Sequence, residues 1–136
     1  MATLYIDDLK ALSFEEIAQI PRDVKAQILR AQAVPVVEAQ RDMARRTFSG
    51  GTTADSAYAE PPVVTQSGGY IITSFQGVRQ RKTPTRNAEI AFLNHYGVKG
   101  KNRETRFVDR ANDQSADESA KAGADILFQW QQKQLL

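Results

Sequence analysis

Residues 85–112 read TRNAEIAFLNHYGVKGKNRETRFVDRAN, and the predicted fold depends most on this stretch. Its first part, residues 87–96, has the spacing of a short helix that is apolar on almost every side. One face carries Ala88, Ala91, Phe92 and Tyr96, whereas Ile90 and Leu93 point elsewhere. A helix without a polar side has to be shielded from water by other residues on two of its sides. We expect one cover to come from this chain and the other from a neighbouring subunit, because an exposed apolar patch usually marks an interface.

The composition predicts one globular domain with a modest core, because the 136 residues are 41% hydrophobic and 25% charged. Within residues 1–136 we expect a short N-terminal helical arm, residues 1–20, and a core, residues 21–133. The chain has no cysteine, which excludes disulfides and thiolate chemistry and is typical of a reducing environment. No apolar run approaches the roughly 20 residues of a membrane span, and the acidic N-terminal segment is unlike a signal peptide.

Charge is unevenly distributed along the chain. Although the formal net charge is only +2, residues 79–110 hold nine basic and three acidic residues, a local charge of +6. The remainder therefore carries −4. A basic sector of this kind suits either nucleic-acid binding or complementary contact between copies of the chain, and a simple solvated face is the commonest alternative.

Two helices are predicted in the first third of the chain. A capping-box pattern that begins at Ser13 predicts a short helix there. Pro21 can serve as the first residue of a second helix, which extends to about Phe48. Pro35 lies in the middle of this helix. We expect a kink or a break near residues 31–34, because proline removes one backbone hydrogen bond and clashes with the preceding turn.

A β-hairpin is predicted next, after a loop over residues 49–62. Residues 63–66 and 70–76 are rich in β-branched and aromatic side chains, which favour strands. The segment Ser67-Gly68-Gly69 between them predicts a tight turn. Residues 78–80 are expected to prolong the pairing of the second strand.

Two helices are predicted in the C-terminal part. The helix over residues 87–96 should stop at Gly97, and residues 105–108 are expected to add an edge strand. A final helix should run from residue 109 or 112 to about Lys133, with a buried stripe made of Ala116, Ala120, Gly123, Leu127 and Trp130. The predicted fold is α+β, with a long kinked N-terminal helix, an antiparallel sheet based on a β-hairpin, a short apolar helix and a C-terminal helix.

The residue inventory offers little to catalysis or to metal binding. His95 is the only histidine, and without cysteines it cannot complete a zinc site. No serine lies in a Gly-x-Ser-x-Gly elbow, and the glycine-rich segments lack the Gly-Lys-Ser/Thr of a phosphate loop. We therefore predict no enzymatic activity, no catalytic residue, no cofactor and no metal, and an interfacial or capping role for His95.

Nucleic-acid binding is the alternative function. The basic segments 79–86 and 99–110 flank the aromatic residues Phe92, Tyr96 and Phe107, and together they could form a strip that contacts phosphates. The aromatic residues also fall where a core needs them, and no helix-turn-helix or stacking motif is present. The alternative is therefore a small basic-patch protein that binds nucleic acid without sequence-specific readout and without enzymatic activity.

Several segments resemble one family in the right order. Residues 86–97, followed by a basic loop, Arg106-Phe107 and an alanine-rich acidic helix ending near Trp130, are similar to the small tail-component family of long-tailed bacteriophages, typified by the gene-ten product of the Hong Kong lambdoid phage. Upstream, similar segments occur at residues 35–40, 51–56 and 70–79, so the resemblance covers roughly residues 24–132. The chain departs from the family pattern at Arg106, where the family usually has proline, and in the threonine–glycine order of residues 49–53.

The resemblance implies a non-enzymatic neck, tail-completion or tail-terminator subunit of the virion. Such a subunit would form a homo-oligomeric ring, a hexamer or alternatively a dodecamer, that joins the DNA-filled head to the tail. It would contact head-completion or connector proteins and tail-tube proteins, and it allows nonspecific contact with DNA in the channel but no membrane. It would occur in the host cytoplasm during assembly.

On this basis we assign two sets of site residues as hypotheses. The subunit interface is expected to contain Ile90, Phe92, Leu93, His95, Tyr96 and Phe107. The basic loops that would face the lumen or a partner ring contain Arg79, Arg81, Lys82, Arg86, Lys99, Lys101 and Arg103.

Overall fold

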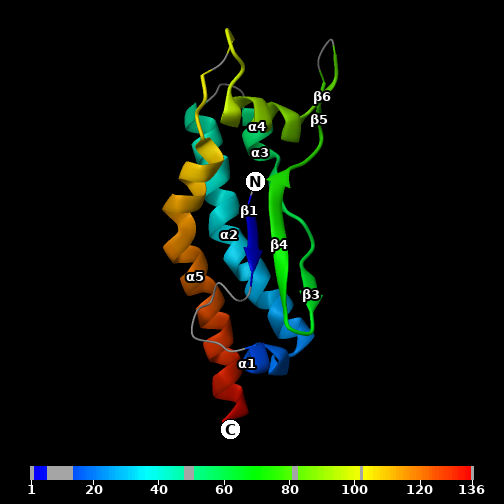
Figure 1. Cartoon of the computed structure of the whole chain (residues 1–136), viewed down its shortest axis with the longest axis vertical. Helices are drawn as coiled ribbons and strands as arrows, with labels where there is room; N and C mark the ends of the chain where they lie inside the picture. Colours follow the sequence, from blue (N-terminus) through cyan, green and yellow to red (C-terminus); the bar gives the residue numbers. More distant parts are fainter. Residues whose placement is uncertain (1, 6–13, 48–50, 81–82, 102, 136) are drawn as a thin grey trace.

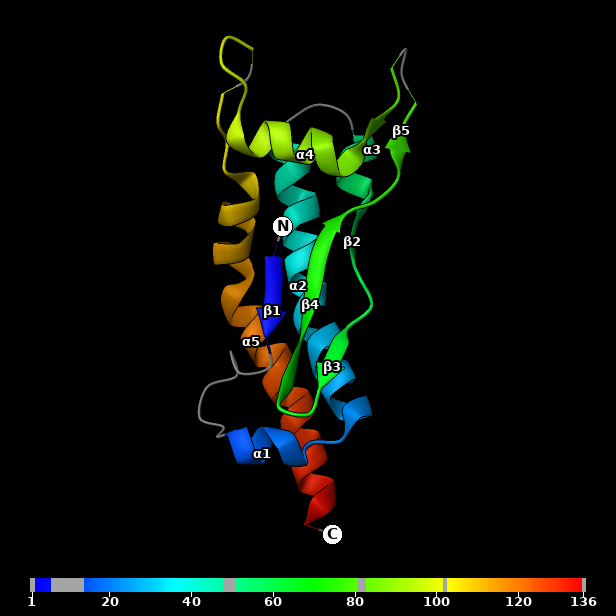
Figure 2. The ribbon, with the colours of Figure 1, turned by 45° about the vertical axis from the view of Figure 1, so that its right-hand side comes forward.

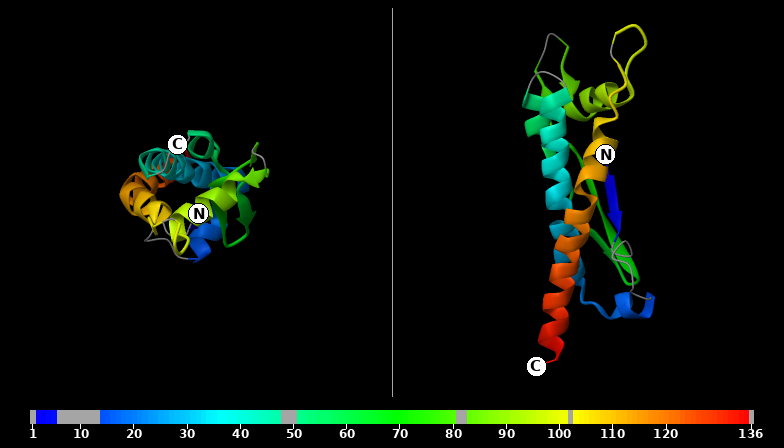
Figure 3. Two further views of the ribbon diagram at one scale, coloured as in Figure 1. Left: turned by 90° about the horizontal axis from the view of Figure 1, so that it is seen from above. Right: turned by 90° about the vertical axis from the view of Figure 1, so that its left-hand side faces the viewer.

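In the computed structural model of this chain, two long helices run side by side along the long axis (Figure 1). They are α2 (Arg22–Thr47) and α5 (Phe107–Gln134). Viewed along that axis, the two helices occupy one side of the molecule and the strands the other (Figure 3). The structure describes residues 2–5, 14–47, 51–80, 83–101 and 103–135. The expected α+β class is confirmed.

The larger sheet is antiparallel and is centred on β4 (Gly68–Phe75). β1 (Ala2–Tyr5) pairs with one side of β4, while β2 (Ala57–Ala59) and β3 (Val63–Thr65) pair with the other. Alternate residues of β4 are buried, as the two-residue period of a strand requires: these are Ile71, Thr73 and Phe75. The predicted hairpin between residues 63 and 76 is therefore confirmed.

The hairpin turn is tighter than predicted, because two glycines belong to the strand instead of the turn. Thr65 pairs with Gly68, so that only Gln66 and Ser67 form the turn. Lys25 holds this turn to α2: its buried ammonium Nζ donates to the carbonyl oxygens of Thr65 (3.0 Å) and Gln66 (2.7 Å). Burial lowers the pKa of Lys25, and the two carbonyl acceptors compensate for the lost water.

Gly69 should tolerate no side chain, whereas its neighbour Gly68 should. A Cβ on Gly69 would lie 2.7 Å from the carbonyl oxygen of Val63 and 3.2 Å from a methyl of Leu29, and nothing lies within 4 Å of the same position on Gly68. We expect Gly69→Ala to lower the free energy of unfolding by about 1–3 kcal/mol, in the range of overpacked sites. Gly68→Ala, measured by the same urea titration, should change it by less than about 0.5 kcal/mol. Equal changes in the free energy of unfolding for the two variants would contradict the close approach of Gly69 to Val63 and Leu29.

Apolar residues are buried in two clusters, one toward each end of the long helices. The first cluster includes a residue of α1 (Phe14–Gln19) and consists of Ile17, Ile20, Ile28, Leu29, Ala33 and Ile71. The second cluster includes residues of α3 (Gly51–Asp55) and α4 (Asn87–Tyr96) and consists of Ala44, Ala54, Ala57, Phe75, Ala91, Phe107 and Val108. The second cluster therefore positions both α4 and the start of α5.

The interior between the clusters is polar. The amide Nε2 of Gln40 donates to the hydroxyl of Thr73 and to the side-chain oxygen of Asn112, both at 3.0 Å. The hydroxyl of Ser119 donates to the carbonyl oxygen of Gln32 at 2.8 Å. These bonds join α2 to β4 and to α5, so the long helices are held in register by directional contacts as well as by packing.

Of the kink or break predicted near residues 31–34, the break is wrong, because α2 continues through Pro35 as one helix. Buried residues lie on both sides of it, with Leu29 and Ala33 before it and Val36 and Gln40 after it. Packing against α5 and β4 on either side of the proline holds the two halves together, and this outweighs the lost backbone hydrogen bond.

The N-terminal part differs from the predicted helical arm. Ala2–Tyr5 forms β1, an edge strand of the sheet, and among the described residues of this part Phe14–Gln19 is helical. The predicted capping box at Ser13 lies outside the described residues. A four-residue strand has too short a pattern to be recognised, and its pairing partner on β4 is about 70 residues away in the chain.

The predicted strand over residues 105–108 is also wrong. The backbone N–H groups of Thr105 and Arg106 both donate to the carbonyl oxygen of His95, at 3.2 and 3.0 Å, and α5 then begins at Phe107. The C-terminal helix is confirmed, and its buried stripe agrees with the prediction in part. Gly123 is buried, and Leu127 and Trp130 are partly buried against the first cluster. Ala116 and Ala120 are exposed, and Ala111, Ser115 and Ser119 are buried instead.

Candidate interaction surfaces

Helix α4 lies across one end of the molecule, and Asn87 at its first position fixes it there (Figure 2). The backbone N–H of Asn87 donates to the carbonyl oxygen of Gly77 at 3.0 Å, and its side-chain Nδ2 donates to that of Gln76 at 2.9 Å. Its Oδ1 accepts the hydroxyl of Thr53 at 3.1 Å. One buried side chain thus attaches α4 both to the end of β4 and to α3.

The extent of α4, Asn87–Tyr96, agrees with the predicted helix. Gly97 ends it with a φ of 80°, and the N–H of Gly97 closes the last turn on the carbonyl oxygen of Leu93 at 2.9 Å. The inner side of α4 is formed by Asn87, Ile90, Ala91 and His95, all of which are buried. The chain therefore supplies the first of the two covers that the apolar helix needs.

The outer side of α4 is mostly apolar and faces solvent. Phe92 is 52% exposed, Leu93 37% and Tyr96 50%. We call these three residues the α4 apolar face. The ring centroids of Phe92 and Tyr96 are 4.7 Å apart, and the guanidinium of Arg106 lies 5.0 Å from the centroid of Tyr96. The face is thus a pre-arranged aromatic pair with a cation at its edge.

Half of the predicted interface residues belong to the interior of the chain itself. Ile90 is 7% exposed, His95 6% and Phe107 0%. Phe107 lies between Phe75 and His95, with ring centroids 6.0 and 5.9 Å away. These three residues are therefore core residues, and only the α4 apolar face remains available to a partner. Helical spacing alone could not separate the two groups, because both sides of α4 are apolar.

His95 caps the next helix. Its Nδ1 accepts the backbone N–H of Val108 at 3.2 Å, in the first turn of α5, and its Nε2 lies 3.5 Å from the carboxylate Oδ2 of Asp109. The neutral tautomer with its proton on Nε2 satisfies both contacts. Burial lowers the pKa of His95, although the nearby carboxylate of Asp109 opposes this effect. The capping role that the sequence suggested is present, but it serves α5 and not α4.

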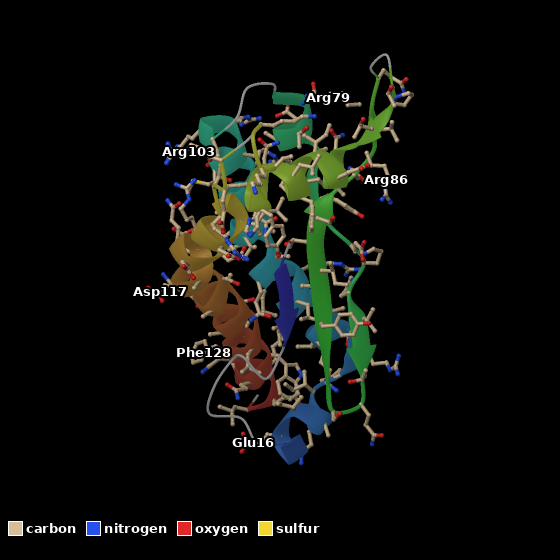
Figure 4. The ribbon with its side chains drawn as sticks, turned by 45° about the horizontal axis from the view of Figure 1, so that its top comes forward. Glu16, Arg79, Arg86, Arg103, Asp117 and Phe128 are labelled. Atoms are coloured by element: carbon tan, nitrogen blue, oxygen red, sulfur yellow. The ribbon has the colours of Figure 1, made fainter. Side chains whose placement is uncertain are left out.

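Three of the predicted basic residues, Arg79, Arg86 and Arg103, lie at the same end of the molecule as α4 (Figure 4). Arg79 lies in β5 (Val78–Arg79) and Arg86 in β6 (Thr85–Arg86), which pair as a short ribbon instead of forming a loop. The guanidinium of Arg79 donates to the hydroxyl of Thr53 at 2.9 Å, so this residue also supports the fold. Arg81 and Lys82 lie outside the described residues.

A cleft of about 600 Å³ opens beside the loop between α4 and α5. We call it the basic cleft; its lining residues are Thr47, Asn94, Lys101, Arg103, Glu104, Thr105 and Arg110. They come from α2, from α4, from the loop and from the first turn of α5. The sequence indicated Lys101 and Arg103, but it could not indicate Thr47 or Asn94, because these residues are polar without any motif.

A second hollow, of about 530 Å³, lies between α2 and the segment that joins β2 to β3. Its apolar lining residues are Ala33, Val34, Val37, Ala59, Pro61, Pro62 and Ile71. Its charged lining residues are Arg30, Glu38, Arg41 and Glu60. We call it the α2 groove. Sequence patterns did not indicate it, since it depends on the loop lying beside the helix.

Within the described part of the chain, no three residues of the metal-binding types gather as a metal site would require. In the same part, no helix is long and apolar enough to cross a membrane.

Comparisons of the chain with protein-family models, with curated proteins and with solved structures gave no match. The function proposed below is therefore based on the residues of the chain.

Proposed function

We propose that this chain is a non-enzymatic structural subunit of a phage virion, located at the head–tail junction as a neck, tail-completion or tail-terminator protein. Copies would form a ring, a hexamer or a dodecamer, between the connector at the DNA-filled capsid and the tail tube. The subunits would assemble in the host cytoplasm. The observation that carries this proposal is the α4 apolar face, which lies on the segment most similar to phage tail components.

The α4 apolar face favours a protein partner over solvent. Exposed aromatic and leucine side chains at one place are the usual sign of an interface. Covering the exposed halves of Phe92 and Tyr96 would contribute roughly 1 kcal/mol each. Arg106 beside Tyr96 adds a cation at the rim, where charged residues of interfaces are normally found.

The distribution of surfaces favours a head-to-tail contact. A ring with one kind of contact needs two different complementary patches on each subunit. The α4 apolar face and the α2 groove are two such patches, and they lie on different elements. Charge is segregated as well: Arg79, Arg86 and Arg103 are at the α4 end, and Glu16 and Asp117 lie away from it (Figure 4). Such an arrangement orients neighbouring copies in one direction.

Leu93→Asp should disperse the assembly without unfolding the chain. Leu93 is 37% exposed, so an aspartate there remains solvated in the monomer but would be buried in the contact. We expect the wild type to form a discrete oligomer by light scattering and mass measurement, and a ring in electron micrographs. The variant should elute as a monomer of 15.1 kDa with an unchanged circular dichroism spectrum.

Phe128→Asp is the matched control. Phe128 is 60% exposed on α5, far from α4, and the substitution introduces the same charge. We expect this variant to keep the wild-type oligomer. An assembly that survives Leu93→Asp but is dispersed by Phe128→Asp would contradict the assignment of the contact to α4. A wild-type chain that stays monomeric, alone and with connector or tail-tube proteins, would contradict the proposed function.

A further inference from the structure

We propose that the basic cleft binds the phosphate backbone of duplex DNA without reading its sequence. The cleft is open and large enough, at about 600 Å³, to admit more than one phosphate group. Its lining contains three cations, Lys101, Arg103 and Arg110. The polar side chains beside them bond within the chain: the hydroxyls of Thr47 and Thr105 donate to the carbonyl oxygens of Met43 and Asn94, and the amide of Asn94 donates to that of Ile90. Lysine and arginine side chains contact phosphate oxygens in protein–DNA complexes, so the cations carry the proposed contact. The site itself needs only one copy of the chain, so this proposal does not depend on ring formation.

The two carboxylates near the cleft, Glu104 and Asp109, share one charged partner, Arg106, because His95 is neutral, so these groups together keep one negative charge against the three cations of the cleft. Glu104 forms an ion pair with Arg106, and Asp109 lies 3.5 Å from both Arg106 and His95. Lys101, Arg103 and Arg110 have no ion pair among the described residues, and Arg110 makes only a long 3.4 Å hydrogen bond to the hydroxyl of Thr47. Three cations therefore remain available to a ligand with several negative charges.

The position of Arg110 is unfavourable for the isolated helix. It lies at the start of α5, where the helix dipole is positive and a cation is unfavourable. A bound phosphate would reverse this effect, because the dipole and the arginine would then both attract the anion. Among the described residues the side chain of Arg110 gains only the long hydrogen bond to Thr47, and a residue that opposes its local structure in this way is typical of a binding site.

The chemistry of the lining favours nucleic acid over an acidic protein. Among the described residues that line the basic cleft none is apolar, whereas protein–protein contacts normally include an apolar centre. Protein–DNA contacts are more polar and more positively charged. An acidic protein partner would be expected at the α4 apolar face instead.

The described part of the lining also offers no platform for stacking on bases. None of the described residues that line the cleft is aromatic. Asn94, which lines the cleft, is about 200° around α4 from both Phe92 and Tyr96, so the exposed rings point away from the cleft. Without a stacking platform, binding should depend on the backbone alone and should not prefer any base composition.

The test compares two variants with the same net charge. Lys101→Gln, Arg103→Gln and Arg110→Gln together remove the three cleft cations. Arg22→Gln, Lys121→Gln and Lys133→Gln together remove three exposed cations elsewhere on α2 and α5. Both triple variants change the formal net charge from +2 to −1. Binding to a fluorescent duplex of about 25 base pairs is measured by anisotropy between 50 and 200 mM salt.

We expect the wild type to lose about 40-fold in affinity over this salt range, as three phosphate contacts predict. The cleft variant should bind at least tenfold more weakly at 50 mM salt, and its salt dependence should be nearly flat. The control variant should keep both the affinity and most of the salt dependence of the wild type.

Two results would overturn the proposal. Equal weakening by the two triple variants would mean that net charge and not the cleft governs binding. In the second result, poly-glutamate at an equal concentration of charge displaces the duplex from the wild type but not from the cleft variant. This would identify an acidic protein as the occupant of the cleft. The oligomeric state is measured on the same samples. A monomer that binds DNA through the cleft would contradict the proposed ring but not the proposed DNA binding.

Discussion

Phe107→Ala should lower the free energy of unfolding by about 3–5 kcal/mol, the range of buried phenylalanine truncations. Phe107 has no exposed surface and packs between Phe75 of β4 and His95 of α4. It also begins α5, so its removal leaves a cavity where three elements meet. A loss of this size is a large part of the stability of a small domain. We therefore expect a chain that is partly unfolded at 37 °C.

Phe128→Ala is the matched control on the same helix. Phe128 is 60% exposed, and its truncation should change the free energy of unfolding by less than about 0.5 kcal/mol. Urea titrations of both variants, followed by circular dichroism, give the comparison. If Phe107→Ala folded normally and lost only its ability to assemble, Phe107 would belong to the subunit contact, as the sequence suggested, and not to the core.

Stability should fall as the pH falls below about 6.5, because of His95. Burial lowers the pKa of this histidine in the folded chain below its usual value of 6.5, so the unfolded chain binds the proton more readily. The contribution of neutral His95 to the free energy of unfolding is complete above pH 6.5 and is lost progressively as the pH decreases toward the pKa of His95 in the folded chain. A protonated Nδ1 would face the N–H of Val108 donor to donor and would remove the cap of α5.

His95→Asn tests this pH dependence. The side-chain oxygen of asparagine can occupy the place of Nδ1 and accept the N–H of Val108, but it does not titrate. We expect the variant to be less stable at pH 8, since the contact with the ring of Phe107 is lost, yet to show little change between pH 7 and 5.5. Thermal melts across this range measure the difference. If the stability of the variant changed with pH as steeply as that of the wild type, His95 would be excluded as the source of the pH dependence.

The elements that were predicted well are those with a strong local pattern. The β-branched run after Ser67, the helical spacing before Gly97 and the long apolar period after Pro21 each correspond to an element with nearly the predicted bounds. The wrong predictions occur where contacts between segments far apart in the sequence determine the local structure. β1 becomes a strand only because β4 offers it an edge, and α2 passes Pro35 only because α5 and the sheet hold both halves.

The site shows the same division. The sequence alone determined that residues 87–96 form a helix with apolar side chains on more than one side, and that the cations concentrate around it. Only the tertiary structure decided that Ile90, His95 and Phe107 face the interior and that Phe92, Leu93 and Tyr96 face outward. It also decided that Thr47 and Arg110, 63 residues apart, line one cleft. The physical reason is that helical periodicity specifies which residues share a side, whereas burial and cleft formation depend on which other elements pack against that side.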